Sequence, residues 1–523
     1  MLFLFLIVLP MFAQPEVCPR APIGGEVIDP ASLASSNARL EVDFTFRTYV
    51  DRYGQTRYCY LSKDNLQAPT LRVHAGDELV FKLTNGLPEE KLAAPPHVHQ
   101  DDCAGGAMTA AATNLHFHGL ALPPTCHQDE TLRTLIRPSA SFEYRVKIPA
   151  GDSPGLYWYH PHPHGYTEPQ VLGGASGALI IEGIERVKPE VAGLPERVLV
   201  LRDQSVPGFA ESDEDSGPGK DISINFVPVL YPLYRPAAMT VRPGERQFWR
   251  VLNASADTYF DLQIRFGQII QDIRDVQTVD LVAFDGVPIG GDARRTHMLL
   301  SPGGRGEFIV TTPPAGTWAQ LVTLAYDTGP DGAASPYRVI ANIRSAADAP
   351  VQPSMPSAPA AAKPFSGLER LEAVRERKLY FSEKRDPVAP NDPNLTKYFI
   401  TVEGATPQAF DMNFTQPDIT VEQGTVEDWI VENRAREAHS FHIHQLHFQL
   451  LERDGEVVNE PMLRDTIDLP YWDGKSDRYP SVKLRMDFRS RDIVGTFVYH
   501  CHILEHEDGG MMGSIRVAGQ HKH

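Results

Sequence analysis

The sequence predicts an all-β protein made of three tandem Greek-key β-sandwiches. The chain has 523 residues, too many for one hydrophobic core, and roughly 150 residues per domain suggests three or four domains. Its 44 Pro and 40 Gly favour many short strands and turns over long helices. A diffuse repeat of strand, Gly-containing turn and alternating strand recurs at 72–81, 241–249 and 421–429. These three copies, at domain-sized intervals, indicate three sandwiches.

Strands are expected throughout the first two segments, which we place at 38–186 and 187–345. Polar and apolar residues alternate with period two at 40–46 and 141–147, which is typical of half-buried strands. The apolar run at 177–183 predicts a buried strand that closes the first segment. The second segment continues in the same style.

A linker separates the second segment from the third. Residues 350–364 are rich in Pro, Ala and Ser, which indicates a semi-rigid connection, and we place the linker at 346–375. A charged stretch at 368–377 is compatible with a helix. Strands resume at 398–402 in the third segment, 376–517.

The N-terminus and the overall charge bear on location and partners. Residues 1–13 form an apolar run, short for a membrane span of roughly 20 residues. We interpret it as a secretory signal cleaved after Ala13, although it lacks a basic start; a short buried strand is the alternative. No other stretch approaches spanning length, so we expect a secreted or periplasmic protein. The net charge of −18, without a long basic run, argues against a nucleic-acid partner.

Five cysteines occur, and export would allow disulfides between them. The first four, Cys18, Cys59, Cys103 and Cys126, permit three connectivities. We favour Cys18 with Cys59 and Cys103 with Cys126. Cys501 is left over and lies between two histidines.

Ten of the 19 histidines fall into four tight clusters instead of being scattered. Residues i and i+2 of a strand point to the same face, so each His-x-His can place two imidazoles side by side. Such pairs occur in the first and third segments and not in the second, which predicts a polynuclear metal site shared by the outer two. The clusters are His116 and His118; His160 and His162; His439, His442 and His444; and His500, His502 and His506.

The last cluster has a second consequence. Cys501 projects opposite to His500 and His502, so one strand can serve two metal sites on its two faces. Two imidazoles, a thiolate and a weak thioether are the ligands of a trigonal copper centre that transfers electrons. Copper would hold Cys501 as thiolate, and the backbone would join the two sites by a short covalent path. The alternative is a buried Cys among structural histidines. The predicted ligands are His439, Cys501, His506 and Met511.

These residues resemble the copper-binding signatures of the three-domain multicopper oxidases, the laccase and copper-efflux-oxidase group. The matching strings are Trp158-Tyr-His-Pro-His162 and His500-Cys-His-Ile-Leu-Glu-His-Glu-Asp-Gly-Gly-Met-Met512. The resemblance spans about residues 38–517 and implies cupredoxin-like sandwiches holding four copper ions. It would give the type 1 copper the four ligands above. It implies His116 and His442 for the type 2 copper; His118, His160 and His502 for one type 3 ion; and His162, His444 and His500 for the other.

Two acids are candidates for the chemistry, because reducing dioxygen to water consumes protons. Glu507 follows His506 in the matching string and is the expected proton donor; a surface carboxylate is the alternative. The family has a second acid after the first His-x-His block, usually in an Asp-Gly setting. This chain departs from that pattern with Cys126-His-Gln-Asp-Glu130, and Asp129 is the candidate.

Other histidines are not expected to bind metal. His97 and His99 share the i, i+2 spacing, but their surroundings predict a solvated loop. His164 extends the second cluster and is expected beside the ligands. His447 is expected in packing or at the surface, and the tail residues His521 and His523 do not form a site.

The predicted reaction is a laccase-like, one-electron oxidation of phenols or aromatic amines, coupled to reduction of dioxygen to water. A metallo-oxidase acting on Cu(I), Fe(II) or Mn(II) is the second hypothesis. Of the 11 Met, only Met355 falls in 346–397, which disfavours Cu(I). A non-catalytic copper-storage protein would not explain why Cys501 joins two sites, and a nitrite-reductase-like protein lacks the eight-histidine cluster. The expected partners are dioxygen and a small-molecule or metal-ion reductant. The sequence leaves the oligomeric state open, with a monomer as the working expectation.

Overall fold

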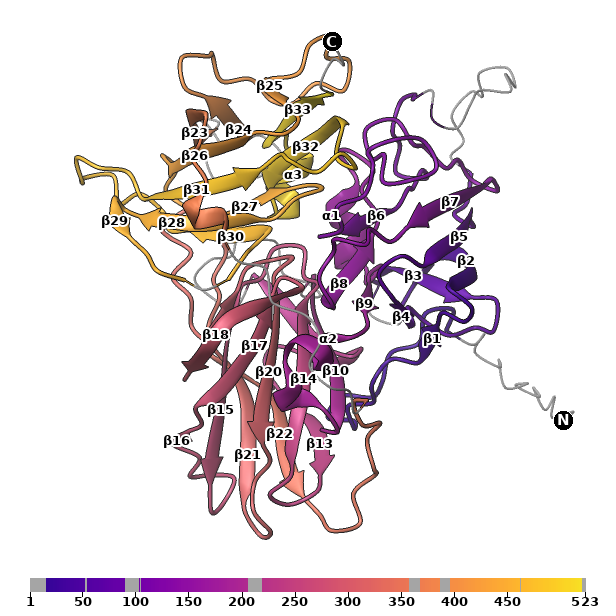
Figure 1. Cartoon of the computed structure of the whole chain (residues 1–523). Coiled ribbons are helices and arrows are strands. Elements are labelled where there is room, and N and C mark those ends of the chain that lie inside the picture. The colour runs from indigo at the N-terminus through magenta and orange to yellow at the C-terminus, as the bar shows by residue number, and fades with distance from the viewer. Residues whose placement is uncertain are drawn as a thin grey trace, which may run out of the picture.

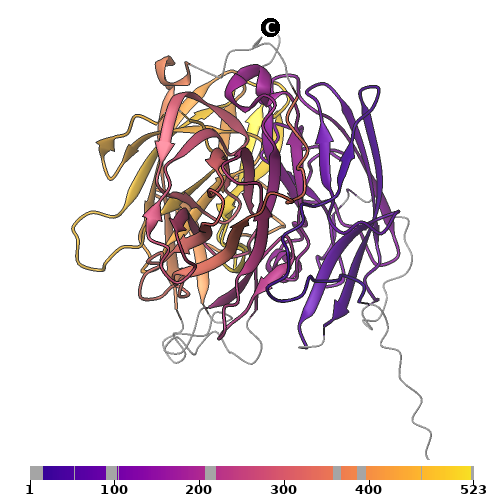
Figure 2. The ribbon, with the colours of Figure 1, turned by 90° about the horizontal axis from the view of Figure 1, so that it is seen from below.

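The computed structural model describes residues 16–51, 54–89, 103, 105–205, 219–356, 367–385, 396–460 and 462–519. The predicted signal at 1–13 lies outside these residues. Figure 1 shows three β-sandwiches at the corners of a triangle, the first in indigo to purple, the second in magenta to salmon and the third in orange to yellow. Seen from below in Figure 2, the second sandwich lies in front of the third, and the first stands beside them. The predicted all-β fold of three sandwiches is confirmed.

The first sandwich packs a four-stranded sheet against a five-stranded sheet, with strand orders β3-β2-β5-β7 and β1-β4-β9-β8-β6. Phe142, Tyr144 and Val146 alternate along β7 and point into the core, as the period-two pattern predicts. The elements are β1 (Ser32–Ala34), β2 (Arg39–Val50), β3 (Thr56–Ser62), β4 (Thr70–Val73), β5 (Glu78–Asn85), β6 (His116–His118), β7 (Ser141–Lys147), β8 (Gly155–His160), α1 (Thr167–Leu172), β9 (Gly177–Ile181), α2 (Ile184–Val187) and η1 (Pro189–Val191).

The second sandwich has the sheets β12-β11-β10-β14-β20-β17-β18 and β13-β22-β21-β15-β16, with β19 paired to β15. Its elements are β10 (Glu196–Ser205), β11 (Lys220–Ile224), β12 (Val227–Val229), β13 (Ala237–Val241), β14 (Arg246–Asn253), β15 (Phe260–Gly267), β16 (Asp275–Val276), β17 (Val279–Phe284), β18 (Val287–Arg295), β19 (Met298–Leu300), β20 (Arg305–Thr311), β21 (Trp318–Leu324) and β22 (Arg338–Ser345).

The third sandwich has the sheets β24-β23-β26-β31-β28-β29 and β25-β33-β32-β27-β30. Its elements are η2 (Leu368–Arg370), β23 (Arg375–Lys384), β24 (Lys397–Val402), β25 (Ile419–Glu422), β26 (Val426–Asn433), β27 (His439–Ile443), β28 (Phe448–Arg453), β29 (Glu456–Val457), β30 (Thr466–Leu469), β31 (Ser481–Asp487), β32 (Gly495–Cys501), α3 (Leu504–Asp508) and β33 (Met512–Ala518).

The linker region differs from expectation. A helix at 368–377 is wrong: this stretch holds the short turn η2 and the start of β23. Leu379 and Phe381 alternate into the core of the third sandwich, and β23 pairs with β26 in parallel, which an extended strand alone allows. Earlier in the linker, Met355 is buried against the second sandwich and its amide donates to the Leu194 carbonyl at 2.8 Å. The exact limits of the three domains stay a prediction; β1, before residue 38, joins the first sandwich.

Two disulfides and one contact between sandwiches tie the chain together. The predicted disulfides, Cys18–Cys59 and Cys103–Cys126, are both formed, with Cα–Cα distances of 5.9 and 5.7 Å. Asp508 of α3 accepts the first backbone amides of α1, from Thr167 at 3.0 Å and Glu168 at 2.8 Å. A carboxylate at a helix N-terminus is favourable, so this contact fixes the third sandwich against the first.

Within the described residues, no helix combines the length and the apolar character needed to cross a membrane.

Candidate metal centre

Four short segments of the first and third sandwiches carry the predicted ligands, and strand pairing brings them together. In the first sandwich β6 pairs antiparallel with β8, so that His116 lies opposite His160. In the third, β27 pairs with β32, so that His442 lies opposite His500. Each sandwich therefore presents two neighbouring histidine strands toward the other.

The eight imidazoles predicted for the shared site meet across this interface and are buried. The rings of His116 and His444 stack with centroids 3.9 Å apart, and those of His118 and His442 stack at 4.0 Å. His500 Nε2 lies 3.2 Å from His444 Nε2 and its separation from His162 Nε2 is 3.5 Å. The eight are His116, His118, His160, His162, His442, His444, His500 and His502.

The donor atoms of this cluster fit metal ions. Several imidazole nitrogens have no hydrogen-bond partner among the described residues although they are buried: His116 Nε2, His118 Nδ1, His160 Nε2 and His442 Nε2. Burial, with neighbouring imidazoles, lowers the pKa of His118, His160, His162, His442, His444 and His500 well below the usual value. Neutral imidazoles with free lone pairs are the form that binds metal.

The opposite nitrogens of these rings are held by acceptors, which fixes ring orientation as around a metal site. Asp129 accepts from His116 Nδ1 at 3.0 Å and also from the Phe117 amide at 2.9 Å. Asp465 accepts from His118 Nε2 at 3.2 Å through its carboxylate and from His442 Nδ1 at 2.8 Å through its carbonyl. Asp465 was missed by sequence reasoning, because its Arg464-Asp-Thr466 setting has no ligand-type spacing.

A second site lies on the other face of β32. Cys501 Sγ is 3.6 Å from His439 Nδ1 and 3.7 Å from His506 Nδ1, and these two nitrogens are 3.1 Å apart. Cys501 is a free, buried cysteine, and burial raises the pKa of its thiol. Met511 is buried in the same core, and its carbonyl accepts the Cys501 amide at 3.0 Å. Three donors converging on one point suit a single ion.

The structure places the proton-donor candidate Glu507 and two of the histidines that were not expected to bind metal. Glu507 is buried beside the shared site, 3.3 Å from His500 Nδ1 and 3.6 Å from His162 Nδ1, and accepts from Thr167 Oγ1 at 3.1 Å. His164 is buried next to His162, as expected. His447 is partly buried and packs against the second sandwich, where its Nε2 contacts the Asp285 carbonyl at 2.8 Å. His97, His99, His521 and His523 lie outside the described residues.

Sequence reasoning also missed two carboxylates at the outer edges of the Cys501 site. Glu383 Oε1 lies 3.3 Å from His439 Nε2, and Glu437 Oε1 lies 3.0 Å from His506 Nε2. Both side chains are buried. Glu437 stands two residues before His439, but Glu383 lies on β23, far away in sequence, and no local pattern identifies it.

The chain has three sandwiches, a site that contains Cys501 and an eight-imidazole cluster, and the backbone at Cys501 joins the two sites. This combination defines a copper oxidoreductase. Comparisons agree: family models described as multicopper oxidase match residues 107–186 and 387–521, which contain all predicted ligands. The chain belongs to the multicopper oxidase family, whose members use one type 1 copper, one type 2 copper and a type 3 pair.

Individual relatives are distant but cover the chain. A multicopper oxidase of Staphylococcus haemolyticus is 24% identical over 87% of this chain and 82% of its own length. A solved multicopper oxidase of Campylobacter jejuni, described as a metallo-oxidase, has a TM-score of 0.67 at 23% identity and 97% coverage of both chains. The laccase-like oxidase CueO of Ochrobactrum sp. has a TM-score of 0.66 at 20% identity, covering 94% of this chain and 100% of its own.

Removing copper is expected to weaken the contact between the first and third sandwiches, because both supply imidazoles to one cluster. A ligand that binds only the folded state stabilises it by about 4 kcal/mol when its free concentration is about 1,000 times its Kd. Thermal unfolding of copper-loaded and copper-free protein should therefore show a lower midpoint without copper. Superimposable unfolding curves would contradict a shared site at this interface.

Proposed function

We propose that the donors divide among four copper ions as the family resemblance implies. The convergence of one sulfur and two Nδ1 atoms supports the type 1 assignment, and the Nε2 contacts of His500 with His162 and His444 support one type 3 ion. The proposed ligands are His439, Cys501, His506 and Met511 for type 1; His116 and His442 for type 2; and His118, His160 and His502, with His162, His444 and His500, for the type 3 pair.

The proposed reaction couples one-electron oxidation of a reductant to four-electron reduction of dioxygen to water. Copper supplies the redox chemistry and the binding of oxygen. The observation that supports coupling is the position of Cys501, whose sulfur belongs to one site while its bonded neighbours His500 and His502 belong to the other. A copper-storage protein needs no such link. Oxygen uptake by copper-loaded protein with a reductant tests the reaction, and absence of uptake contradicts it.

Glu507 is proposed to deliver protons to the shared site. Burial, and after it the neighbouring Asp508, raise the pKa of its carboxyl well above the usual value, which favours the acid form. Its oxygens lie against two imidazoles of the cluster, and Thr167 keeps it in place. A protonated acid within reach of the reacting centre is what proton delivery requires.

Asp129 is proposed to act through His116. Its carboxylate is fully committed, to His116 Nδ1, to the Phe117 amide and to Gln445 Nε2 at 2.6 Å. These contacts orient the imidazole and increase its basicity toward a metal ion. The structure thus supports a positioning role for Asp129 more directly than a proton-delivery role.

The reductant is proposed to be a divalent cation, Fe(II) or Mn(II), which reverses the order of the two hypotheses favoured by the sequence. Glu383 and Glu437 contact the outer nitrogens of both type 1 imidazoles. Against the effect of burial, the hydrogen bond from His439 lowers the pKa of Glu383 to about 2, whereas burial and the adjacent Glu383 raise the pKa of Glu437. Oxygen ligands suit hard divalent ions, and a negative charge favours a product with one more positive charge.

An aromatic reductant is the second candidate. A cavity of about 780 Å³ on the third sandwich is lined by Tyr471, Trp472 and Tyr479, whose rings suit a phenol or aromatic amine. The backbone amide of Trp472 donates to the Ala435 carbonyl at 2.8 Å, on the loop that leads to His439. The described lining residues of this cavity include neither type 1 imidazole, whereas the two glutamates contact both.

Replacing both carboxyl groups by amides separates these candidates. The double variant Glu383→Gln/Glu437→Gln is expected to raise the KM for Fe(II) by about tenfold or more, a loss of about 1.4 kcal/mol in binding. Oxidation of a simple phenol should change little. Steady-state oxygen uptake with each reductant measures both effects, after the blue absorption has shown that the type 1 site is intact.

Glu403→Gln is the matched control, because Glu403 lies on the same sandwich and pairs with Arg434 at 2.8 Å, without contact to an imidazole of the site. It should leave both reactions unchanged. Equal losses with Fe(II) and phenol in the double variant would contradict a cation site.

Export to the periplasm or the exterior is also inferred. Disulfides persist in oxidising compartments, and this chain forms Cys18–Cys59 and Cys103–Cys126 while Cys501 stays free.

A further inference from the structure

One buried arginine of the second sandwich, Arg305 at the start of β20, contacts all three sandwiches. Its Nε donates to the Leu156 carbonyl of the first sandwich at 3.2 Å. Nη1 and Nη2 donate to the carbonyls of Gly303 at 3.1 Å and Asp285 at 2.9 Å, in its own sandwich. The same two nitrogens also donate to the two carboxylate oxygens of Asp465 in the third sandwich, each at 2.7 Å. All five N–H donors of the guanidinium are thus used.

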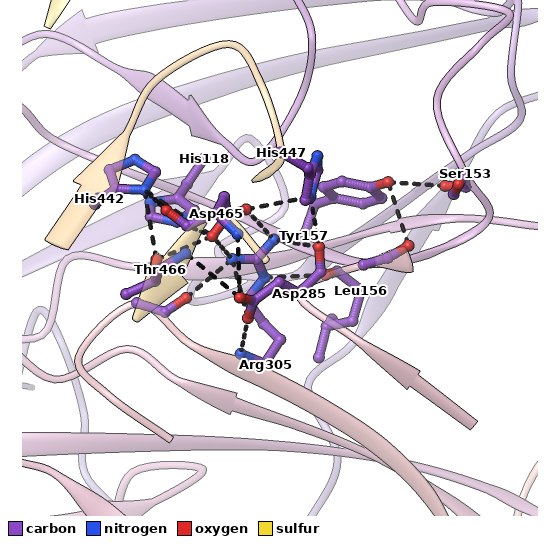
Figure 3. A network of polar contacts seen from close by, with 12 residues as sticks. His118, Ser153, Leu156, Tyr157, Asp285, Arg305, His442, His447, Asp465 and Thr466 are labelled. Carbon is purple, nitrogen blue, oxygen red and sulfur yellow. Dashed lines mark hydrogen bonds and ion pairs between the residues drawn. The ribbon is translucent and has the colours of Figure 1, made fainter. Parts of the chain in front are cut away.

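Asp465 is the point where this arginine meets the shared metal site (Figure 3). Its Oδ1 accepts from His118 Nε2 at 3.2 Å and from Thr466 Oγ1 at 2.9 Å, and its carbonyl accepts from His442 Nδ1 at 2.8 Å. One residue therefore orients an imidazole from each of the two sandwiches that form the site. The other two nitrogens, His118 Nδ1 and His442 Nε2, have no hydrogen-bond partner among the described residues and are available to metal.

The second sandwich also fixes the backbone at Asp465. The turn between β17 and β18 places Asp285 so that its Oδ2 accepts the Asp465 amide at 3.2 Å and its Oδ1 the Arg305 amide at 2.9 Å. The turn seats closely on β8: a Cβ on Gly155 would lie 2.1 Å from the Gly286 carbonyl oxygen. Only glycine permits this approach of the two backbones.

We propose that Arg305 is a positioning residue for the trinuclear copper site, acting through Asp465 on His118 and His442. The second sandwich, which has no predicted ligand, would in this way control how the other two present their imidazoles. The bidentate grip holds both oxygens of Asp465 in one plane, so that Oδ1 faces His118. This proposal rests on His118 and His442 being copper ligands, as proposed above.

Arg305→Lys keeps the positive charge and removes the planar guanidinium with its paired donors. One ammonium group cannot bind both Asp465 oxygens and three carbonyls. We expect the copper affinity of the trinuclear site to fall roughly 10- to 100-fold, the range for losing an outer partner of a metal-binding histidine. Copper-loaded protein is dialysed against graded chelator. Type 2 electron paramagnetic resonance and the near-ultraviolet type 3 absorption report trinuclear occupancy, and the blue type 1 absorption serves as internal reference.

Two further variants make the test specific. Asp465→Asn keeps the side-chain shape and the carbonyl that accepts from His442, and should show the same loss; the double variant should be no worse than either single one. Arg250→Lys is the matched control: Arg250 is a fully buried arginine of the second sandwich that pairs with Glu196 and Glu307. It should lower stability but keep the wild-type ratio of trinuclear to type 1 copper.

Wild-type trinuclear occupancy in Arg305→Lys at every chelator concentration would overturn the inference. So would an equal loss in Arg250→Lys, which would indicate general loosening, or additive losses in the double variant. Folded, copper-loaded wild-type protein without trinuclear signals would instead refute the ligand assignment itself. The two failures are thereby distinguishable.

Discussion

Cys501→Ser is expected to abolish both the intense blue absorption and turnover, because serine cannot supply the thiolate of the type 1 site. Cys501 Sγ lies 3.6 Å from His439 Nδ1 and 3.7 Å from His506 Nδ1. The eight-imidazole cluster uses no atom of the Cys501 side chain, so it should still bind copper. Absorption spectra, copper analysis and oxygen uptake of the loaded variant measure the three outcomes.

Met511→Leu is the matched control for this variant. It removes the proposed weak ligand and leaves the thiolate, so the blue colour should persist while the type 1 potential rises. An intense blue absorption in Cys501→Ser would refute the type 1 assignment, and loss of all copper would show that Cys501 is needed for the fold instead.

Glu507→Gln is expected to slow reoxidation of the reduced enzyme by dioxygen by on the order of 10²-fold, the low end for loss of a positioned acid. Glutamine keeps the shape and accepts from Thr167, but it cannot deliver a proton. Reduction of the type 1 copper should stay near the wild-type rate, because that step needs no proton from this residue. Stopped-flow measurements of reduction and reoxidation, made separately, test both halves of the expectation.

Glu505→Gln provides the comparison for Glu507. Both residues lie on α3, but Glu505 faces Tyr398, whose hydroxyl donates to it at 3.4 Å, and not the shared cluster. Its reoxidation kinetics should match the wild type. Wild-type reoxidation in Glu507→Gln would remove Glu507 from the mechanism and leave it as a buried structural acid beside Asp508.

The sequence alone determined the fold class and pointed to the histidines and the cysteine that the fold brings together. Alternation such as that of 141–147 is a local property, because successive side chains of a strand point to opposite faces. The same period of two placed His500 on one face of β32 and Cys501 on the other, with His502 just beyond the strand's end. Local sequence did not decide the secondary structure of 368–377. Its charged residues suited a helix, but β23 is extended and pairs with β26.

The tertiary structure decided everything that depends on how the sandwiches meet. His162 and His500 are 338 residues apart, and Arg305 and Asp465 are 160 apart, so no local period relates them. The same holds for Glu383, whose contact with His439 supports the proposed cation reductant although the sequence favoured an aromatic one. Strand periodicity fixes which face a side chain occupies, whereas its partner is fixed by the packing of three separate cores, through long-range contacts that leave no regular spacing in the chain.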